Sequence, residues 1–146
     1  MLTIDLDKVN IADGSKILDL GCGKGRHRHE LYDCSKCDVI GVDLAIEEVK
    51  YTYQGFQQYP DINESSDRKF SLMAGTALQL PFKDNTFDHI ICSEVLEHIY
   101  DYDNVINEIF RISNTGTSIG VSVPRLLQEK ICWLLSDDYN NERGGH

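Results

Sequence analysis

No segment of this chain is long and apolar enough to cross a membrane, so a membrane-spanning protein is not expected. The first residues include Asp5 and Asp7 and have no cationic start before an apolar stretch, which argues against a secretory signal peptide. Internal repeats, low-complexity segments and interdomain linkers are also absent. For a chain of 146 residues, these absences predict a single domain over residues 1–146, located in the cytoplasm.

Basic residues are scarce relative to acidic ones. The chain has 14 Lys and Arg against 24 Asp and Glu, which gives a net charge of −10. Nucleic-acid phosphates would repel so acidic a protein, so DNA and RNA are not expected as partners. Lys24, Arg26 and Arg28 form one compact basic cluster, which we interpret as the solvated face of a helix.

The five cysteines lack the pattern of a disulfide framework. Their odd number, in a chain without a secretion signal, indicates free thiols. Cys34 and Cys37 have zinc-like spacing, and His27 and His29 lie just upstream, but a second Cys or His pair at loop spacing is missing. We therefore expect no metal site, and a zinc-binding interaction domain stays open as an alternative that metal analysis would decide.

What is present is an alternation of strand-like and helix-like patterns, which predicts βαβ units and a mostly parallel sheet. Expected strands cover residues 16–20, 39–42, 70–74, 87–92 and 117–123. Expected helices cover residues 25–32 and 126–135, with two more between them. Their apolar faces are formed by Ile46, Val49, Tyr53 and Phe56 in one and by Val105, Ile106, Ile109 and Ile112 in the other. The fold class is thus α/β, a three-layer sandwich.

The glycines between the first expected strand and helix indicate a ligand site. Gly21, Gly23 and Gly25 let the backbone turn sharply and approach a ligand, and a helix start favours an electron-rich group. Asp43, at the end of the second expected strand, is placed to hold a ribose. The dinucleotide fingerprint has a third glycine where this chain has Arg26, which argues against a nicotinamide-dependent oxidoreductase.

Four segments in order extend this pattern along nearly the whole chain: residues 17–27 (ILDLGCGKGRH), 41–44 (GVDL), 75–82 (GTALQLPF) and 87–98 (FDHIICSEVLEH). The series closely resembles the class I S-adenosylmethionine-dependent methyltransferases, particularly the small-molecule branch often called methyltransferase type 11. The resemblance implies a Rossmann-like sheet and methyl transfer from S-adenosylmethionine to a small molecule such as a quinone, lipid or sugar precursor. A truncated, non-catalytic S-adenosylmethionine-binding module is the alternative.

The resemblance also implies roles for individual residues at the first two strand ends. Gly21 and Gly23 resemble the glycines whose backbone cradles the methionine part of the cofactor, with Cys22 as an unreactive packing residue between them. Asp19 resembles the acidic residue that orients this loop and faces the amino group. Asp43 resembles the carboxylate that accepts both ribose hydroxyls.

The remaining cofactor contacts follow in the same way. Leu44 would pack on the adenine ring, and Thr76 and Ala77 stand where the family contacts the adenine edge. An acidic residue is common at the position of Thr76, so we expect weaker cofactor affinity here. Ser93 resembles part of the wall beside the sulfonium.

The catalytic residue is left unassigned. Glu94, Glu97 and His98 follow the fourth expected strand, and His98 is a candidate base because imidazole titrates near neutral pH.

Family members continue into two further strands where this chain stops, so we expect a sheet that lacks its C-terminal strands. Residues 117–123 would then form an exposed edge, which predicts a possible homodimer.

Overall fold

The computed structural model describes residues 8–23, 31, 37–57 and 69–136. The described elements are, in chain order, β1 (Lys16–Leu20), β2 (Asp38–Asp43), α2 (Ile46–Gln57), β3 (Lys69–Ala74), β4 (Phe87–Ser93), the short 3-10 helix η2 (Leu96–His98), α4 (Tyr102–Ile112), β5 (Ser113–Ser122) and α5 (Arg125–Leu134). None of these helices is both long and apolar enough to cross a membrane.

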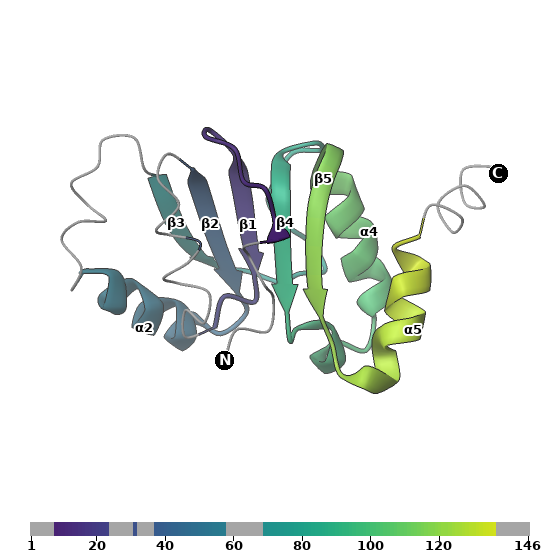
Figure 1. Cartoon of the computed structure of the whole chain (residues 1–146). Helices are drawn as coiled ribbons and strands as arrows, with labels where there is room; N and C mark the ends of the chain where they lie inside the picture. Colours follow the sequence, from purple (N-terminus) through teal and green to yellow (C-terminus); the bar gives the residue numbers. More distant parts are fainter. Residues whose placement is uncertain (1–7, 24–30, 32–36, 58–68, 137–146) are drawn as a thin grey trace.

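The strands form one sheet in the order β3-β2-β1-β4-β5, and every neighbouring pair is parallel. All arrowheads therefore point to the same edge of the sheet (Figure 1). The chain crosses from β3, at one edge, to β4, on the far side of β1, so the order reverses beside β1. Ligands bind at such a switch point, outside the carboxyl ends of the strands.

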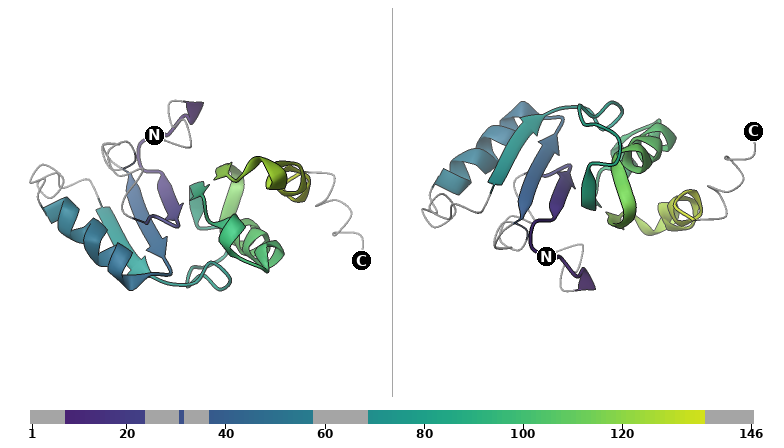
Figure 2. Two further views of the ribbon diagram at one scale, coloured as in Figure 1. Left: turned by 90° about the horizontal axis from the view of Figure 1, so that it is seen from below. Right: turned by 90° about the horizontal axis from the view of Figure 1, so that it is seen from above.

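Side chains alternate between the two faces of the sheet, and each face has its own core. Leu18 and Ile90 pack with the buried face of α4 and with Ile131 of α5. Their chain neighbours Ile17 and Ile91 belong to a second cluster on the other face. Helix α2 packs on β2 and β3, at the opposite end of the sheet from α4 and α5 (Figure 2). The predicted α/β sandwich with a parallel sheet is confirmed.

Two details differ from the sequence-based prediction. Strand β5 begins at Ser113, directly after α4, four residues before the predicted start, and an irregularity lies opposite residues 87–89 of β4. Helix α2 buries only part of the predicted face: Val49 is buried, but Ile46 and Tyr53 are each 49% exposed, and the Phe56 side chain lies outside what the structure describes. Among the described side chains of the helix, Val49 and Thr52 are buried, and the Thr52 hydroxyl donates to the Gly23 carbonyl at 2.6 Å.

Several predicted features lie outside the described residues. They are most of the helix over residues 25–32, the basic cluster Lys24, Arg26 and Arg28, and the zinc-like group apart from Cys37. Strand β5 is an edge of the described sheet, as predicted. Its Ile119 and Val121 side chains, and Val123 just after the strand, pack against the core. Association through that edge stays a prediction.

Candidate functional site

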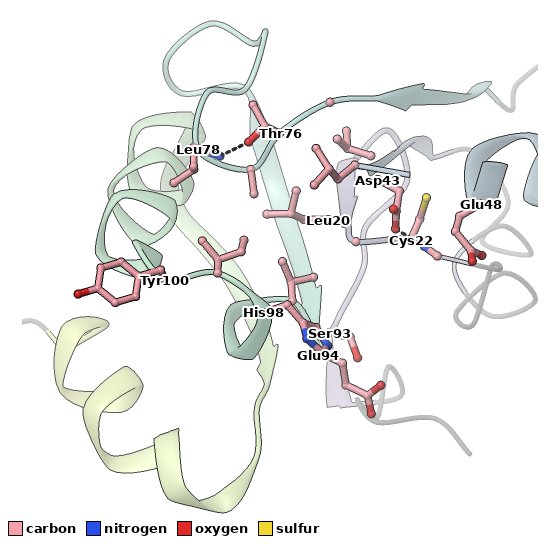
Figure 3. Close-up of a pocket in the computed structure, with 18 residues that line it drawn as sticks. Leu20, Cys22, Asp43, Glu48, Thr76, Leu78, Ser93, Glu94, His98 and Tyr100 are labelled. Carbon is pink, nitrogen blue, oxygen red and sulfur yellow. Dashed lines mark hydrogen bonds between the residues drawn. The ribbon is translucent and has the colours of Figure 1, made fainter. Parts of the chain in front are cut away.

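A cavity of about 980 Å³ opens at the carboxyl ends of β1, β2, β3 and β4. Its walls come from the four segments that follow these strands (Figure 3). Eight of the nine predicted cofactor-site residues line it: Gly21, Cys22, Gly23, Asp43, Leu44, Thr76, Ala77 and Ser93. Asp19 is the exception, because it is buried in β1.

The loop after β1 requires glycine for two separate reasons. The backbone φ angle is 75° at Gly21 and 49° at Gly23. Residues with a Cβ rarely adopt this left-handed region. A Cβ at Gly21 would also overlap the Val95 side chain, which comes from the segment after β4. The backbone N–H groups of Gly21 and Cys22 both donate to the Val42 carbonyl, at 2.7 and 3.2 Å. The first loop is therefore held against the end of β2.

Asp43 fixes this loop with its side chain. One carboxylate oxygen accepts the Gly23 N–H at 2.8 Å, and the other accepts the Ala45 N–H at 2.9 Å, just before α2. Each carboxylate oxygen has a second lone pair, so Asp43 can still accept hydrogen bonds from a ligand. The sequence indicated a ribose contact for Asp43; the structure adds a role in holding the glycine loop and the start of α2.

Asp19 is 1% exposed, and neither carboxylate oxygen has a hydrogen-bond partner. Burial, together with the nearby charge of Asp43, raises its pKa from 3.8 to about 7. The same burial raises the pKa of the Cys22 thiol to about 12, with further contributions from Asp19, Asp43 and Glu48. Cys22 is thus a protonated, unreactive thiol at neutral pH, which agrees with its interpretation as a packing residue.

The segment after β3 forms another wall. Leu44 is 78% exposed at the cavity, and Ala77 is buried across the loop. The Thr76 hydroxyl accepts the Leu78 N–H at 3.2 Å, so it is partly engaged in its own turn.

An arginine on α4 anchors the far end of this segment. Arg111 donates to the Leu80 and Phe82 carbonyls at 3.0 and 2.7 Å, while Glu108 accepts the Leu80 N–H at 2.7 Å. The wall formed by the turn is therefore fixed to the core of the domain.

At the end of β4 the backbone is strained. Glu94 has φ of 55°, unusual for a residue other than glycine, and its N–H donates to the Ser122 carbonyl at 3.1 Å. Ser93 and Ser122 share a hydrogen bond between their hydroxyls at 2.9 Å. Of the three residues after the fourth predicted strand that were considered for chemistry, Glu94 and His98 line this cavity, whereas Glu97 lines a separate cavity of about 670 Å³ beside β5 and α5.

The sequence-based reasoning did not single out several other lining residues, among them Glu48, Val95, Ile99 and Tyr100. Glu48 lies in the first turn of α2, five residues after Asp43. Its place at the start of the helix that follows β2 could have indicated it, because that helix start lies at the same end of the sheet as Asp43. Val95 could not be found from sequence, since its role depends on contact with Gly21 across the sheet.

Metal binding finds no support in the part of the chain that the structure describes. Within residues 8–23, 31, 37–57 and 69–136, no three His, Cys, Asp or Glu side chains are grouped to hold an ion.

Comparison with known proteins places these features in a family. A family model described as "Methyltransferase domain" matches residues 11–142. The sterol 24-C-methyltransferase erg6 of Schizosaccharomyces pombe is 29% identical over 95% of this chain and 33% of its own length. The norajmaline N-methyltransferase of Rauvolfia serpentina is 35% identical over 70% of this chain and 34% of its own length.

Solved structures agree on the fold. A SAM-dependent methyltransferase from Methanosarcina mazei superposes with a TM-score of 0.71 at 23% identity, covering 88% of this chain and 61% of that one. The present chain spans about one third of the length of the curated relatives that it matches.

Proposed function

The chain belongs to the methyltransferase domain family, and from this premise we propose that it binds S-adenosylmethionine in the cavity and transfers the methyl group to a small organic acceptor. The observation that carries the proposal is the joining of Asp43 to the glycine loop by the hydrogen bond from Gly23. This bond brings a diol-accepting carboxylate and a set of exposed backbone groups into one cavity.

The residues fit the cofactor in chemistry as well as position. The oxygens of Asp43 retain lone pairs for the ribose hydroxyls, and exposed Leu44 and buried Ala77 offer apolar surface for the adenine. Asp19 holds a buried carboxyl without a partner beneath the glycine loop, which suits a ligand with a positively charged amino group. A cavity of about 980 Å³ has room for a cofactor and part of an acceptor.

The protein's contribution to the reaction is mainly positioning. When bound, the cofactor supplies an electrophilic methyl group on a sulfonium. Gly21, Gly23 and Asp43 would orient that donor, and Ser93 and Glu94 would form the wall toward the acceptor. Alignment of donor and acceptor can lower such a barrier by roughly 7–11 kcal/mol. His98 lines the same cavity and would take the proton from an acceptor hydroxyl or amine that must lose one.

The acceptor is proposed as a small molecule of the quinone, lipid or sugar-precursor class. Two observations support a small molecule: the net charge of −10, which disfavours nucleic acid, and the relatives named for sterol and alkaloid methylation.

Calorimetry with S-adenosylmethionine, S-adenosylhomocysteine and NAD tests the cofactor assignment. We expect binding of the first two ligands and not of NAD, and a large loss of affinity in Asp43→Ala. Asp38→Ala is the matched control, because Asp38 lies on the same strand at its opposite end. A hundredfold excess over Kd should stabilise the fold by about 2.7 kcal/mol.

Two results would count against the proposal. Folded protein that binds neither S-adenosyl ligand would refute the cofactor site. Protein that binds both, yet forms no S-adenosylhomocysteine with any acceptor tried, would favour the non-catalytic binding module.

A further inference from the structure

The cavity wall around Cys22 is negatively charged. Asp43 and Glu48 line the cavity there, and the charges of Asp19, Asp43 and Glu48 all act on the Cys22 thiol. Figure 3 shows Glu48 beside Cys22 and Asp43, across the cavity from Tyr100. No lysine or arginine is among the described residues that line the cavity. This wall therefore lacks a compensating cation among those residues.

Glu48 differs from Asp43 in how its oxygens are used. Both oxygens of Asp43 accept backbone N–H groups, whereas Oε2 of Glu48 is buried and has no hydrogen-bond partner. A buried carboxylate oxygen without a partner lowers the stability of the folded protein. Asp19, which is almost completely buried and also without a partner, lies in β1, directly before the same loop. Near Cys22, Oε2 of Glu48 in the cavity wall and both oxygens of Asp19 in β1 are thus buried without a hydrogen-bond partner.

The neighbouring glutamate, Glu47, lies on the solvent side of α2, so only one side of the first helical turn presents a glutamate to the cavity. Glu47 is 82% exposed and forms an ion pair with Lys50 at 3.4 Å. Both glutamates lie in the first turn of α2, so the helix dipole favours each of them equally. The dipole therefore does not explain why Glu48 faces the cavity without a partner.

Among the described residues, no group of three potential ligands is placed to hold a metal ion. An organic cation fits better. S-adenosylmethionine carries a sulfonium and an ammonium against one carboxylate. When the methyl group leaves for the acceptor, the electron pair of the broken S–C bond stays on sulfur, and the product is a thioether with no net charge.

We propose that Glu48 is a specificity-determining residue that recognises the positive charge of the cofactor and makes the site prefer the cationic methyl donor to its uncharged demethylated product. The inference rests on the proposed function, since it assumes that the cavity holds this cofactor. It adds a residue outside the predicted cofactor set, and it gives the negatively charged wall a role in product release.

The test measures Kd for three ligands: S-adenosylmethionine, with a net charge of about +1, S-adenosylhomocysteine, whose ammonium and carboxylate cancel, and 5′-methylthioadenosine, which has no charged group because it lacks the amino-acid end. In Glu48→Gln, S-adenosylmethionine should bind about fivefold more weakly relative to S-adenosylhomocysteine, which corresponds to roughly 1 kcal/mol. 5′-Methylthioadenosine should bind as before. Glu47→Gln, which removes the same charge from the same helical turn on its solvent side, should leave all three affinities unchanged.

Two outcomes would overturn the inference alone: Glu48→Gln weakens the three ligands equally, or it changes none of them. Wild-type protein that is folded and binds none of the three would overturn the proposed function and this inference together. If Glu48→Gln does not fold, the wild-type protein still gives an answer. Its affinity for S-adenosylmethionine should fall with added salt more steeply than its affinity for the uncharged product, and equal slopes would refute the role of Glu48.

Discussion

The buried carboxyl of Asp19 makes a direct prediction about stability and pH. Its pKa is raised from 3.8 to about 7 by burial and by the charge of Asp43, and neither oxygen has a hydrogen-bond partner. In the unfolded chain this carboxyl should titrate near its ordinary value. Between pH 4 and pH 7 the folded protein therefore holds a proton on Asp19 that the unfolded chain has lost.

The sign follows from proton binding. Because the folded state binds more protons in this window, the free energy of unfolding decreases as the pH rises, and above pH 7 the whole loss persists. Each pKa unit corresponds to about 1.4 kcal/mol, so a rise from 3.8 to about 7 removes roughly 4 kcal/mol of stability at pH 8. Asp19→Asn keeps the shape of the side chain and removes its charge, so this variant should not show that loss.

Denaturant unfolding at several pH values, without ligand, is the assay. Relative to wild type, Asp19→Asn should gain stability progressively from pH 4 to pH 8. Asp13→Asn is the control, because residue 13 is an exposed turn position that suits asparagine equally well. Parallel curves for Asp19→Asn and wild type across this range would refute the reasoning.

Two further predictions concern the loops around the cavity. Gly21→Ala should lose about 2–4 kcal/mol of stability, because the residue has a positive φ and the added Cβ would overlap Val95. Gly14→Ala, where φ is 79° and no atom lies near the added Cβ, should lose only about 1–2 kcal/mol in the same denaturant titration. Equal losses would show that the overlap with Val95 is unimportant. The Thr76→Asp variant should bind S-adenosylmethionine about threefold to tenfold more tightly, because a carboxylate can accept the Leu78 N–H and still face the adenine amino group. Calorimetry measures this affinity, and Thr76→Asn is the uncharged control. No gain in affinity would contradict the assignment of Thr76 to the adenine edge.

Periodicity and glycine placement were sufficient to predict most of the fold. The strand over residues 16–20 was placed correctly, and the four apolar residues predicted to face the core from α4 are all buried. The helix α2 shows where periodicity fails. Ile46 and Tyr53 recur at helical spacing yet remain half exposed, because the helix is turned so that Val49 and Thr52 face inward. On that inward side, the Thr52 hydroxyl donates to the Gly23 carbonyl, a long-range contact that no local pattern encodes.

The site could be predicted in outline for a similar reason. Parallel strands bring their carboxyl ends to one edge, so residues following separate strands were expected to meet, and eight of nine do line the cavity. The individual hydrogen bonds and side-chain contacts between these segments could not be predicted from the sequence. That Asp43 accepts the Gly23 N–H, or that Val95 requires a glycine at position 21, depends on distances set by the whole sheet.

The unpartnered carboxyl groups connect stability with binding. In the absence of ligand, both oxygens of Asp19 and Oε2 of Glu48 are buried without the hydrogen bonds that would offset their desolvation, and this lowers the stability of the fold. A cationic ligand that neutralises them should bind with a free energy that includes relief of this cost. Replacing either carboxylate by its amide should therefore change stability and affinity in opposite directions. The free protein should become more stable, and its affinity for the charged cofactor should fall. If these carboxyl groups had a purely structural role, the stability of the free protein and its affinity for the cofactor would both decrease in the amide variants.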